Sequence, residues 1–188
     1  MHLHQRQDRH RDALRRRLRV YSFRPISDQD IARLDDWVRR SHVARWWTKP
    51  ENWAERVRNR ISEIWIDHYI VGVDGHEFGF IQCYRPWLEQ PNSWPDQPAG
   101  THGIDQFIAD PDMLGRGHGS AFVRQFVDGI FASTDAPRVI TDPSPDNARA
   151  VRAYGKAMFK TVGQVDAPDG RALLMLRERP TATQTDET

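Results

Sequence analysis

The chain has 188 residues, one cysteine and a formal net charge of +1, which predicts one globular domain that buries about 70% of its unfolded surface. No apolar run approaches the roughly 18 residues of a membrane helix, and no signal peptide is expected, so the sequence argues against a membrane protein. The lone Cys83 excludes an intrachain disulfide framework; it is expected in the core of a protein kept in a reducing cytoplasm.

The positive charge is concentrated at the N-terminus. Arginines crowd residues 1–18, as in an arm that binds nucleic acid or a membrane surface, but no aromatic residues interleave with them. We therefore favour a solvated extension, disordered or helical, and do not expect a nucleic-acid partner. One domain is expected over residues 19–178, followed by a disordered polar tail over 179–188.

The first half of the chain predicts strands, helices and one long loop. In order, these are a strand over 19–23, helices over 28–40 and 50–61, strands over 65–73 and 77–84, and a loop over 85–100. Ser27 can cap the first helix, and Asp74-Gly75 is a hairpin turn signal. The loop contains four prolines, and a loop of this length in a compact domain is more often functional than idle.

The second half alternates strands and helices. A strand over 103–109 leads to a glycine-rich loop and an amphipathic helix, followed by a short strand over 139–140, another helix, and strands over 160–165 and 171–176. One face of the amphipathic helix carries apolar side chains at helical spacing, namely Phe122, Val123, Phe126, Val127, Ile130 and Phe131. The expected architecture is α/β (α+β), a mixed sheet flanked by helices.

The glycine-rich loop, residues 114–120, reads Leu-Gly-Arg-Gly-His-Gly-Ser. Closely spaced glycines let the backbone turn tightly and present its N–H groups to a phosphate at a helix N-terminus. The spacing fits neither the dinucleotide fingerprint nor the P-loop. An ordinary strand-to-helix connection, with glycines for close packing, remains the alternative.

A second segment, residues 141–159, leaves the short strand through two prolines and enters a helix that Asp146 or Asn147 can cap. With the preceding loop it resembles the acetyl-CoA site of the GNAT acetyltransferase superfamily over residues 103–165. Further motifs resemble aminoglycoside 6'-N-acetyltransferases across residues 21–177. They are Gly103-Ile104-Asp105-Gln106, Thr141-Asp142-Pro143-Ser144-Pro145, Pro168-Asp169-Gly170 and Ser41-His42-Val43-x-x-Trp46-Trp47.

The chain departs from the superfamily pattern at three positions. Leu114 stands where an Arg or Gln usually opens the loop, and Gly155 and Met158 replace an expected Glu and Gly. These departures concern local packing more than the chemistry.

The resemblance implies a single GNAT-like domain with a central, mostly antiparallel mixed sheet, and acetyl-CoA as co-substrate without a metal. The residues expected to hold acetyl-CoA are Phe107, Ile108, Arg116, Gly117, His118, Gly119, Ser120 and Asn147. The small-molecule acceptor would be a polycationic amine, whose amino groups Asp105, Asp142 and Asp169 would bind. The chain would act as a monomer or a homodimer.

Aromatic surfaces suited to sugar rings are offered by Trp46, Trp47 and Trp94. Each of these side chains and acids also has a structural interpretation. The first two tryptophans could belong to the core, and Asp142 and Asp169 could be ordinary turn residues. Asp105 is less ordinary, because it interrupts a buried-looking strand where a carboxylate is costly unless it is paired or used.

The expected chemistry is direct attack of the amine on the thioester, without an acyl-enzyme. Asp105 would bind the ammonium group and accept its proton, and Tyr154 would donate a proton to the leaving thiolate. Ammonium groups lower the pKa of a carboxylate, so Asp105 could instead be only an anchor. Alternative acceptors are a polyamine, a hydroxylysine-type siderophore precursor and a peptide amine.

Overall fold

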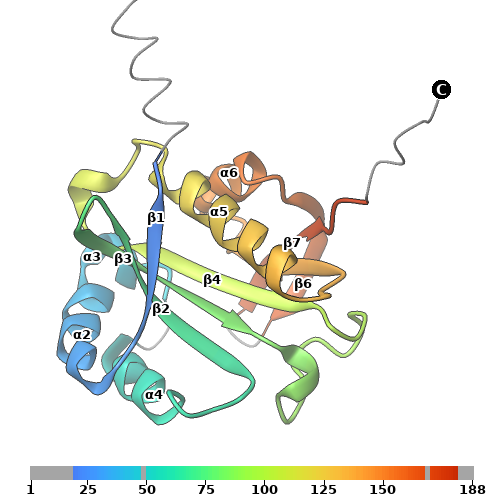
Figure 1. Ribbon diagram of the computed structural model, residues 1–188, viewed down its shortest axis with the longest axis horizontal. Helices are drawn as coiled ribbons and strands as arrows, with labels where there is room; N and C mark the ends of the chain where they lie inside the picture. Colours follow the sequence, from blue (N-terminus) through green and yellow to red (C-terminus); the bar gives the residue numbers. More distant parts are fainter. Residues whose placement is uncertain (1–18, 48–49, 168–169, 182–188) are drawn as a thin grey trace, which may run out of the picture.

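The computed structural model describes residues 19–47, 50–167 and 170–181, so the predicted extension over 1–18 lies outside it. Within these ranges, seven strands form one sheet in the order β1-β2-β3-β4-β5-β7-β6 (Figure 1). The strands are β1 (Tyr21–Pro25), β2 (Ile66–Val73), β3 (His76–Tyr84), β4 (His102–Ile108), β5 (Arg138–Thr141), β6 (Lys160–Ala167) and β7 (Gly170–Glu178). Among the strands that the structure describes, only the β4–β5 pair is parallel, which confirms the predicted mixed, mostly antiparallel sheet.

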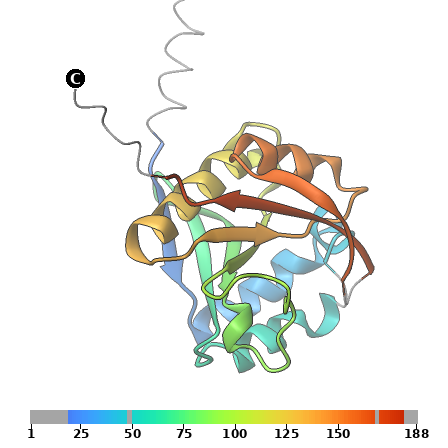
Figure 2. The same ribbon diagram turned by 90° about the vertical axis from the view of Figure 1, so that its right-hand side faces the viewer.

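Helices cover both faces of this sheet (Figures 1 and 2). They are α2 (Ile31–Arg39), α3 (Ser41–Ala44), α4 (Trp53–Asn59), α5 (His118–Ser133) and α6 (Ala148–Lys156). Side chains of α2, α3 and α4 form one buried cluster with β2, β3 and β4, and those of α5 and α6 form a second cluster on the other face. No helix in the described part of the chain is long and apolar enough to cross a membrane.

The predicted order of elements is confirmed, with shifts at element ends. The first helix begins as a 3-10 turn, Asp28–Asp30, and the second is preceded by another, Pro50–Asn52. The short helix α3 was not anticipated. Asp74 and Gly75 have φ angles of 51° and 79°, the positive values that a tight Asp-Gly hairpin turn requires.

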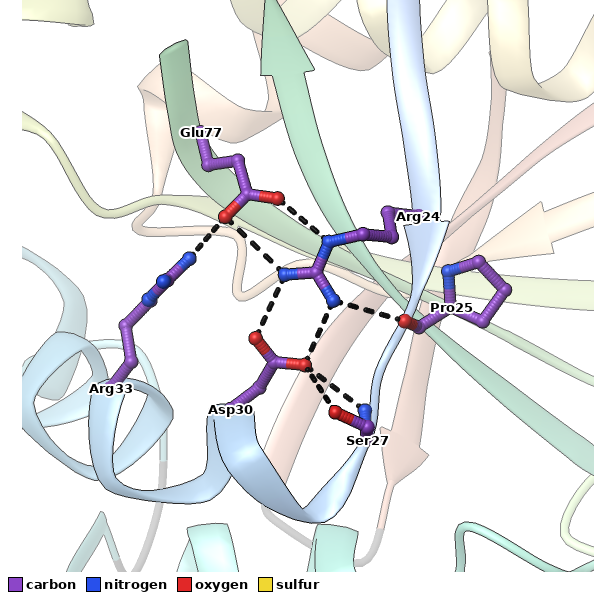
Figure 3. A network of polar contacts seen from close by, with 6 residues as sticks. All are labelled: Arg24, Pro25, Ser27, Asp30, Arg33 and Glu77. Atoms are coloured by element: carbon purple, nitrogen blue, oxygen red, sulfur yellow. Dashed lines mark hydrogen bonds and ion pairs between the residues drawn. The ribbon is translucent and has the colours of Figure 1, made fainter. Parts of the chain in front are cut away.

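An arginine-centred network holds the start of α2 against the sheet (Figure 3). Arg24 of β1 donates to both carboxylate oxygens of Asp30, at 2.9 and 2.8 Å, and to Glu77 of β3. The Arg24 hydrogen bonds hold the pKa of Asp30 well below its usual range. Ser27 donates its backbone N–H to the same carboxylate at 3.0 Å, and Arg33 also pairs with Glu77. The network therefore joins β1, β3 and α2 at one corner.

The sheet opens between β4 and β5. β4 pairs with β5 only at His102↔Val139 and Gly103↔Ile140, whereas on its other side it pairs with β3 as far as Ile108. Beyond Gly103, no strand among the described residues pairs with the β5-facing edge of β4. This opening positions the candidate site.

Candidate active site

A cleft of about 340 Å³ lies beside this open edge of β4, among α3, the glycine-rich loop and α6. Seven of the residues predicted to hold the co-substrate line it, namely Phe107, Ile108, Gly117, His118, Gly119, Ser120 and Asn147. Arg116 is exposed and is not one of the wall residues. The fold therefore brings β4, the glycine-rich loop and the start of α6 together around one cleft, as the resemblance of their motifs predicted.

The glycine-rich loop has the conformation that a phosphate-binding turn needs. Gly115 and Gly117 have φ angles of 72° and 83°, and a Cβ added at either would meet no atom within 4 Å. Glycine is therefore favoured at these two positions by the positive φ angles of the backbone. Close packing, the alternative explanation, does not account for them, because neither position is crowded. Gly117 is the N-cap of α5, whose first turn presents backbone N–H groups without intrahelical acceptors.

The opposite wall of the cleft begins with α3. The Nε2 atom of His42 lies 3.1 Å from the carbonyl oxygen of Ile108, and because a carbonyl only accepts, His42 donates there. Trp46 and Trp47 both line the cleft. Trp47 also packs edge-on against Trp53 at 5.1 Å between ring centroids, so it belongs partly to the core.

The third wall is α6. Asn147 caps this helix, since its side-chain oxygen accepts the backbone N–H of Ala150 at 3.1 Å. Arg149, Arg152 and Lys156 line the cleft along the same helix. The cleft thus joins a helix N-terminus to three cationic side chains, which suits an anionic ligand.

Tyr154 is buried on α6, with 3% of its surface exposed. Burial raises the pKa of its hydroxyl above the usual 10.0, and the charge of Asp105 raises it further, while the nearby polar side chains of Thr141 and Gln106 oppose the shift. The hydroxyl therefore keeps its proton at neutral pH and can act as a donor. Its coupling to Asp105 shows that the two predicted catalytic groups lie near each other.

Asp105 is half-buried on β4 and is not one of the residues that line the cleft. Gln82, its cross-strand partner on β3, donates from Nε2 to Oδ2 of Asp105 at 2.8 Å. Burial raises the pKa of Tyr84 well above its usual value, and Asp105 and Asp142 raise it further, whereas a hydrogen bond with Trp94 lowers it. Both acids and the tryptophan of the long loop therefore gather around Tyr84.

Tyr84 and Gln82 were not predicted as site residues from the sequence. Both lie in an apolar stretch that reads as a core strand, but they pair with Gly103 and Asp105 of β4. The glycine at position 103 is the sequence feature that indicates this contact. A Cβ at that position would lie 2.1 Å from Cζ of Tyr84, so a larger residue would collide with the tyrosine ring. Asp169 lies outside the described residues, so its predicted role in binding the acceptor stays a prediction.

Within the described ranges, no group of three or more histidine, cysteine or acidic residues could hold a metal ion. Cys83 is buried, and burial raises the pKa of its thiol to about 12. The predicted core position of Cys83 is confirmed.

Comparison with known proteins identifies the family. The acetyltransferase (GNAT) domain family matches residues 27–167. The chain belongs to the GNAT acetyltransferases. It is 31% identical over 172 residues to an aminoglycoside N(6')-acetyltransferase type 1 of Klebsiella pneumoniae, covering 87% of this chain and 86% of the relative. A kanamycin resistance protein of Rhizobium radiobacter is 39% identical over 99 residues, which span 52% of this chain and 92% of that protein.

A solved structure supports the same assignment. An aminoglycoside acetyltransferase in complex with coenzyme A and kanamycin superimposes with a TM-score of 0.78 at 32% sequence identity, covering 85% of this GNAT chain and 95% of the other. The predicted resemblance to GNAT enzymes, and within them to aminoglycoside 6'-N-acetyltransferases, is thereby confirmed. This protein is an acetyltransferase of that superfamily by sequence and by fold.

Proposed function

We propose that this GNAT protein transfers the acetyl group of acetyl-CoA to a primary amine of an aminoglycoside, the 6'-amino group. The observation that carries the proposal is the placement of a cation-lined cleft and a carboxylate cluster against the same strand, β4. The relatives' names point to the same acceptor class. A cytoplasmic location is also proposed, on the basis of the single, buried Cys83.

The cleft fits acetyl-CoA, which when bound supplies the acetyl group as a reactive thioester. Backbone N–H groups from Arg116 to Gly119, and those at the start of α5, would bind its pyrophosphate. The unpaired edge of β4 near Phe107 and Ile108 can pair with an extended amide-containing arm as an added strand would. N–H groups on this edge could donate to the thioester carbonyl oxygen.

The acidic cluster fits the polycationic acceptor. Asp105 would bind the reacting ammonium group, with Asp142 and Asp169 holding other amino groups. An ammonium with a pKa near that of lysine, about 10.4, is mostly protonated at neutral pH. Asp105 would therefore take up its proton, directly or through water, so that the neutral amine can attack. Gln82 orients the Asp105 carboxylate for this role.

Tyr154 would complete the proton balance. Burial keeps the hydroxyl protonated at neutral pH, and it would give this proton to the leaving thiolate. The tyrosinate would then take up the second proton that the attacking nitrogen loses as the amide forms. Asn147 would orient the cofactor arm from the N-terminus of α6. Trp46, Trp47 and Trp94 would supply apolar surfaces next to the two substrates.

The test is release of coenzyme A thiol with kanamycin, tobramycin, gentamicin, spermidine, a lysine peptide and N-hydroxylysine as acceptors. We expect efficient turnover of kanamycin and tobramycin, with kcat/KM above about 10⁴ M⁻¹s⁻¹. Turnover confined to spermidine or the lysine compounds would reject the aminoglycoside acceptor while leaving the acetyl-CoA site in place. No turnover and no binding of coenzyme A would reject the enzyme.

A further inference from the structure

Tyr21 of β1 is tied to α5 by three side-chain hydrogen bonds. Gln125 accepts the backbone N–H of Tyr21 at 3.0 Å and donates to its carbonyl oxygen at 2.8 Å. β1 is an edge strand of the described sheet and pairs with β2 on one side only, so these bonds satisfy backbone groups of Tyr21 on its other side. The third bond joins the Tyr21 hydroxyl to Nδ1 of His118 at 3.0 Å. It reaches the first residue of α5, within the glycine-rich loop.

The partners of His118 determine its tautomer. The Arg19 guanidinium lies 3.3 Å from Nε2 of His118. Because a guanidinium only donates, Nε2 must accept, and the ring proton must sit on Nδ1, where it is donated to the Tyr21 hydroxyl. His118 therefore contacts the Arg19 guanidinium through Nε2 and the Tyr21 hydroxyl through Nδ1. Its imidazole also packs against Phe78, at 5.4 Å between ring centroids.

This network bears on the glycine-rich loop because His118 is part of that loop. His118 stands between Gly117 and Gly119, which have no side chains to anchor them and allow more backbone freedom than other residues. His118 is 5% exposed, whereas Gly115, Arg116 and Gly117 are exposed. The buried imidazole is thus the anchor at the point where the loop becomes α5.

We propose that Tyr21, His118 and Arg19 position the first turn of α5 so that its N–H groups are already oriented for the phosphates of the co-substrate. The inference rests on the proposed use of this loop for acetyl-CoA. Binding to backbone N–H groups is strong when the groups need no ordering on binding, because the entropy of ordering is then not lost at that step. Tyr21 does not line the cleft, so it acts through His118 as a positioning residue.

The experiment compares Tyr21→Phe with wild type. The substitution keeps the ring and removes only the hydroxyl, leaving Nδ1–H of His118 without its acceptor. We expect the Kd of coenzyme A, measured by calorimetry without any acceptor, to rise about tenfold. The kcat/KM for S-acetylpantetheine, which carries no phosphate, should stay within about twofold of wild type with the best acceptor of the thiol-release panel.

Gln125→Ala is the matched control, because it loosens the same strand from the same helix two turns beyond the loop. It should lower the melting temperature while leaving the Kd of coenzyme A within about twofold. His118→Asn, whose amide can still donate to Tyr21, should bind coenzyme A more tightly than His118→Leu. An unchanged Kd in Tyr21→Phe, equal weakening in Gln125→Ala, or an equal loss with S-acetylpantetheine would overturn the inference. Failure of wild type to acetylate aminoglycosides while it binds coenzyme A would reject only the proposed acceptor.

Discussion

Two groups of charged side chains lie beside β4, and they differ in sign. The first, the cationic side, is Arg149, Arg152 and Lys156 of α6, which line the cleft. The second, the acidic side, is Asp105 and Asp142, which lie near two buried tyrosines, whose pKa values burial raises and these carboxylates raise further. A polyanionic co-substrate and a polycationic acceptor would each be attracted to one side only.

The cationic and acidic sides also differ in how firmly their charged side chains are fixed in place. The α6 cations are exposed, so water and salt screen them and each contributes little to binding. Asp105 is half-buried and hydrogen-bonded to Gln82 at 2.8 Å, so its orientation is fixed before any ligand arrives. Substitutions on the acidic side should therefore have larger effects than substitutions on the cationic side.

Asp105→Asn should have the largest effect. The amide keeps the size of the side chain but loses the charge that attracts the ammonium and the site that accepts its proton. We expect kcat/KM for kanamycin to fall about a hundredfold or more. The Kd of coenzyme A should be unaffected, because Asp105 is not among the cleft-lining residues. A kcat/KM within about threefold of wild type would refute the assignment of Asp105.

Tyr154→Phe should have a smaller effect, because a thiolate is already a good leaving group, with a pKa of about 8.5 by analogy with cysteine. We expect kcat to fall about tenfold to a hundredfold with little change in either KM. The phenylalanine ring can keep the contact with Phe159, at 5.5 Å between ring centroids, so the melting temperature should change little.

The pH dependence of kcat in Tyr154→Phe gives an independent check of the proposed role of Tyr154. Burial raises the pKa of Tyr154 above 10.0, so the hydroxyl loses its proton only above that pH. The ratio of wild-type to variant kcat should therefore be constant from pH 7 to about pH 9. A ratio of one throughout this interval would show that Tyr154 is not the proton donor.

Much of this arrangement could be predicted from local sequence patterns. The apolar spacing of α5, the Asp-Gly turn and the glycines at positions 115 and 117 each depend on a few neighbouring residues. The predicted Asn147 cap likewise follows from its position at the start of α6. For the same reason, seven of the eight residues predicted to hold the co-substrate line one cleft, and their contact with the co-substrate stays a prediction.

What could not be predicted depends on long-range register. The separation of β4 from β5 follows from only two paired residues on each strand, a number no sequence pattern encodes. Tyr84 reads as a core residue until β3 is aligned with β4, where its ring covers Gly103. The anchoring of His118 by Tyr21 joins residues 97 positions apart, so spacing within the loop could not reveal it.

The cationic side should give the smallest effect. Lys156→Ala removes an exposed charge from the cleft wall, so the KM for acetyl-CoA should rise about threefold at low salt, with kcat unchanged. The difference from wild type should disappear near 1 M salt, where the screening length is about 3 Å. Lys160→Ala is the matched control, since Lys160 is also exposed but does not line the cleft. An equal effect of both substitutions would mean that general surface charge, rather than this wall of the cleft, attracts the co-substrate.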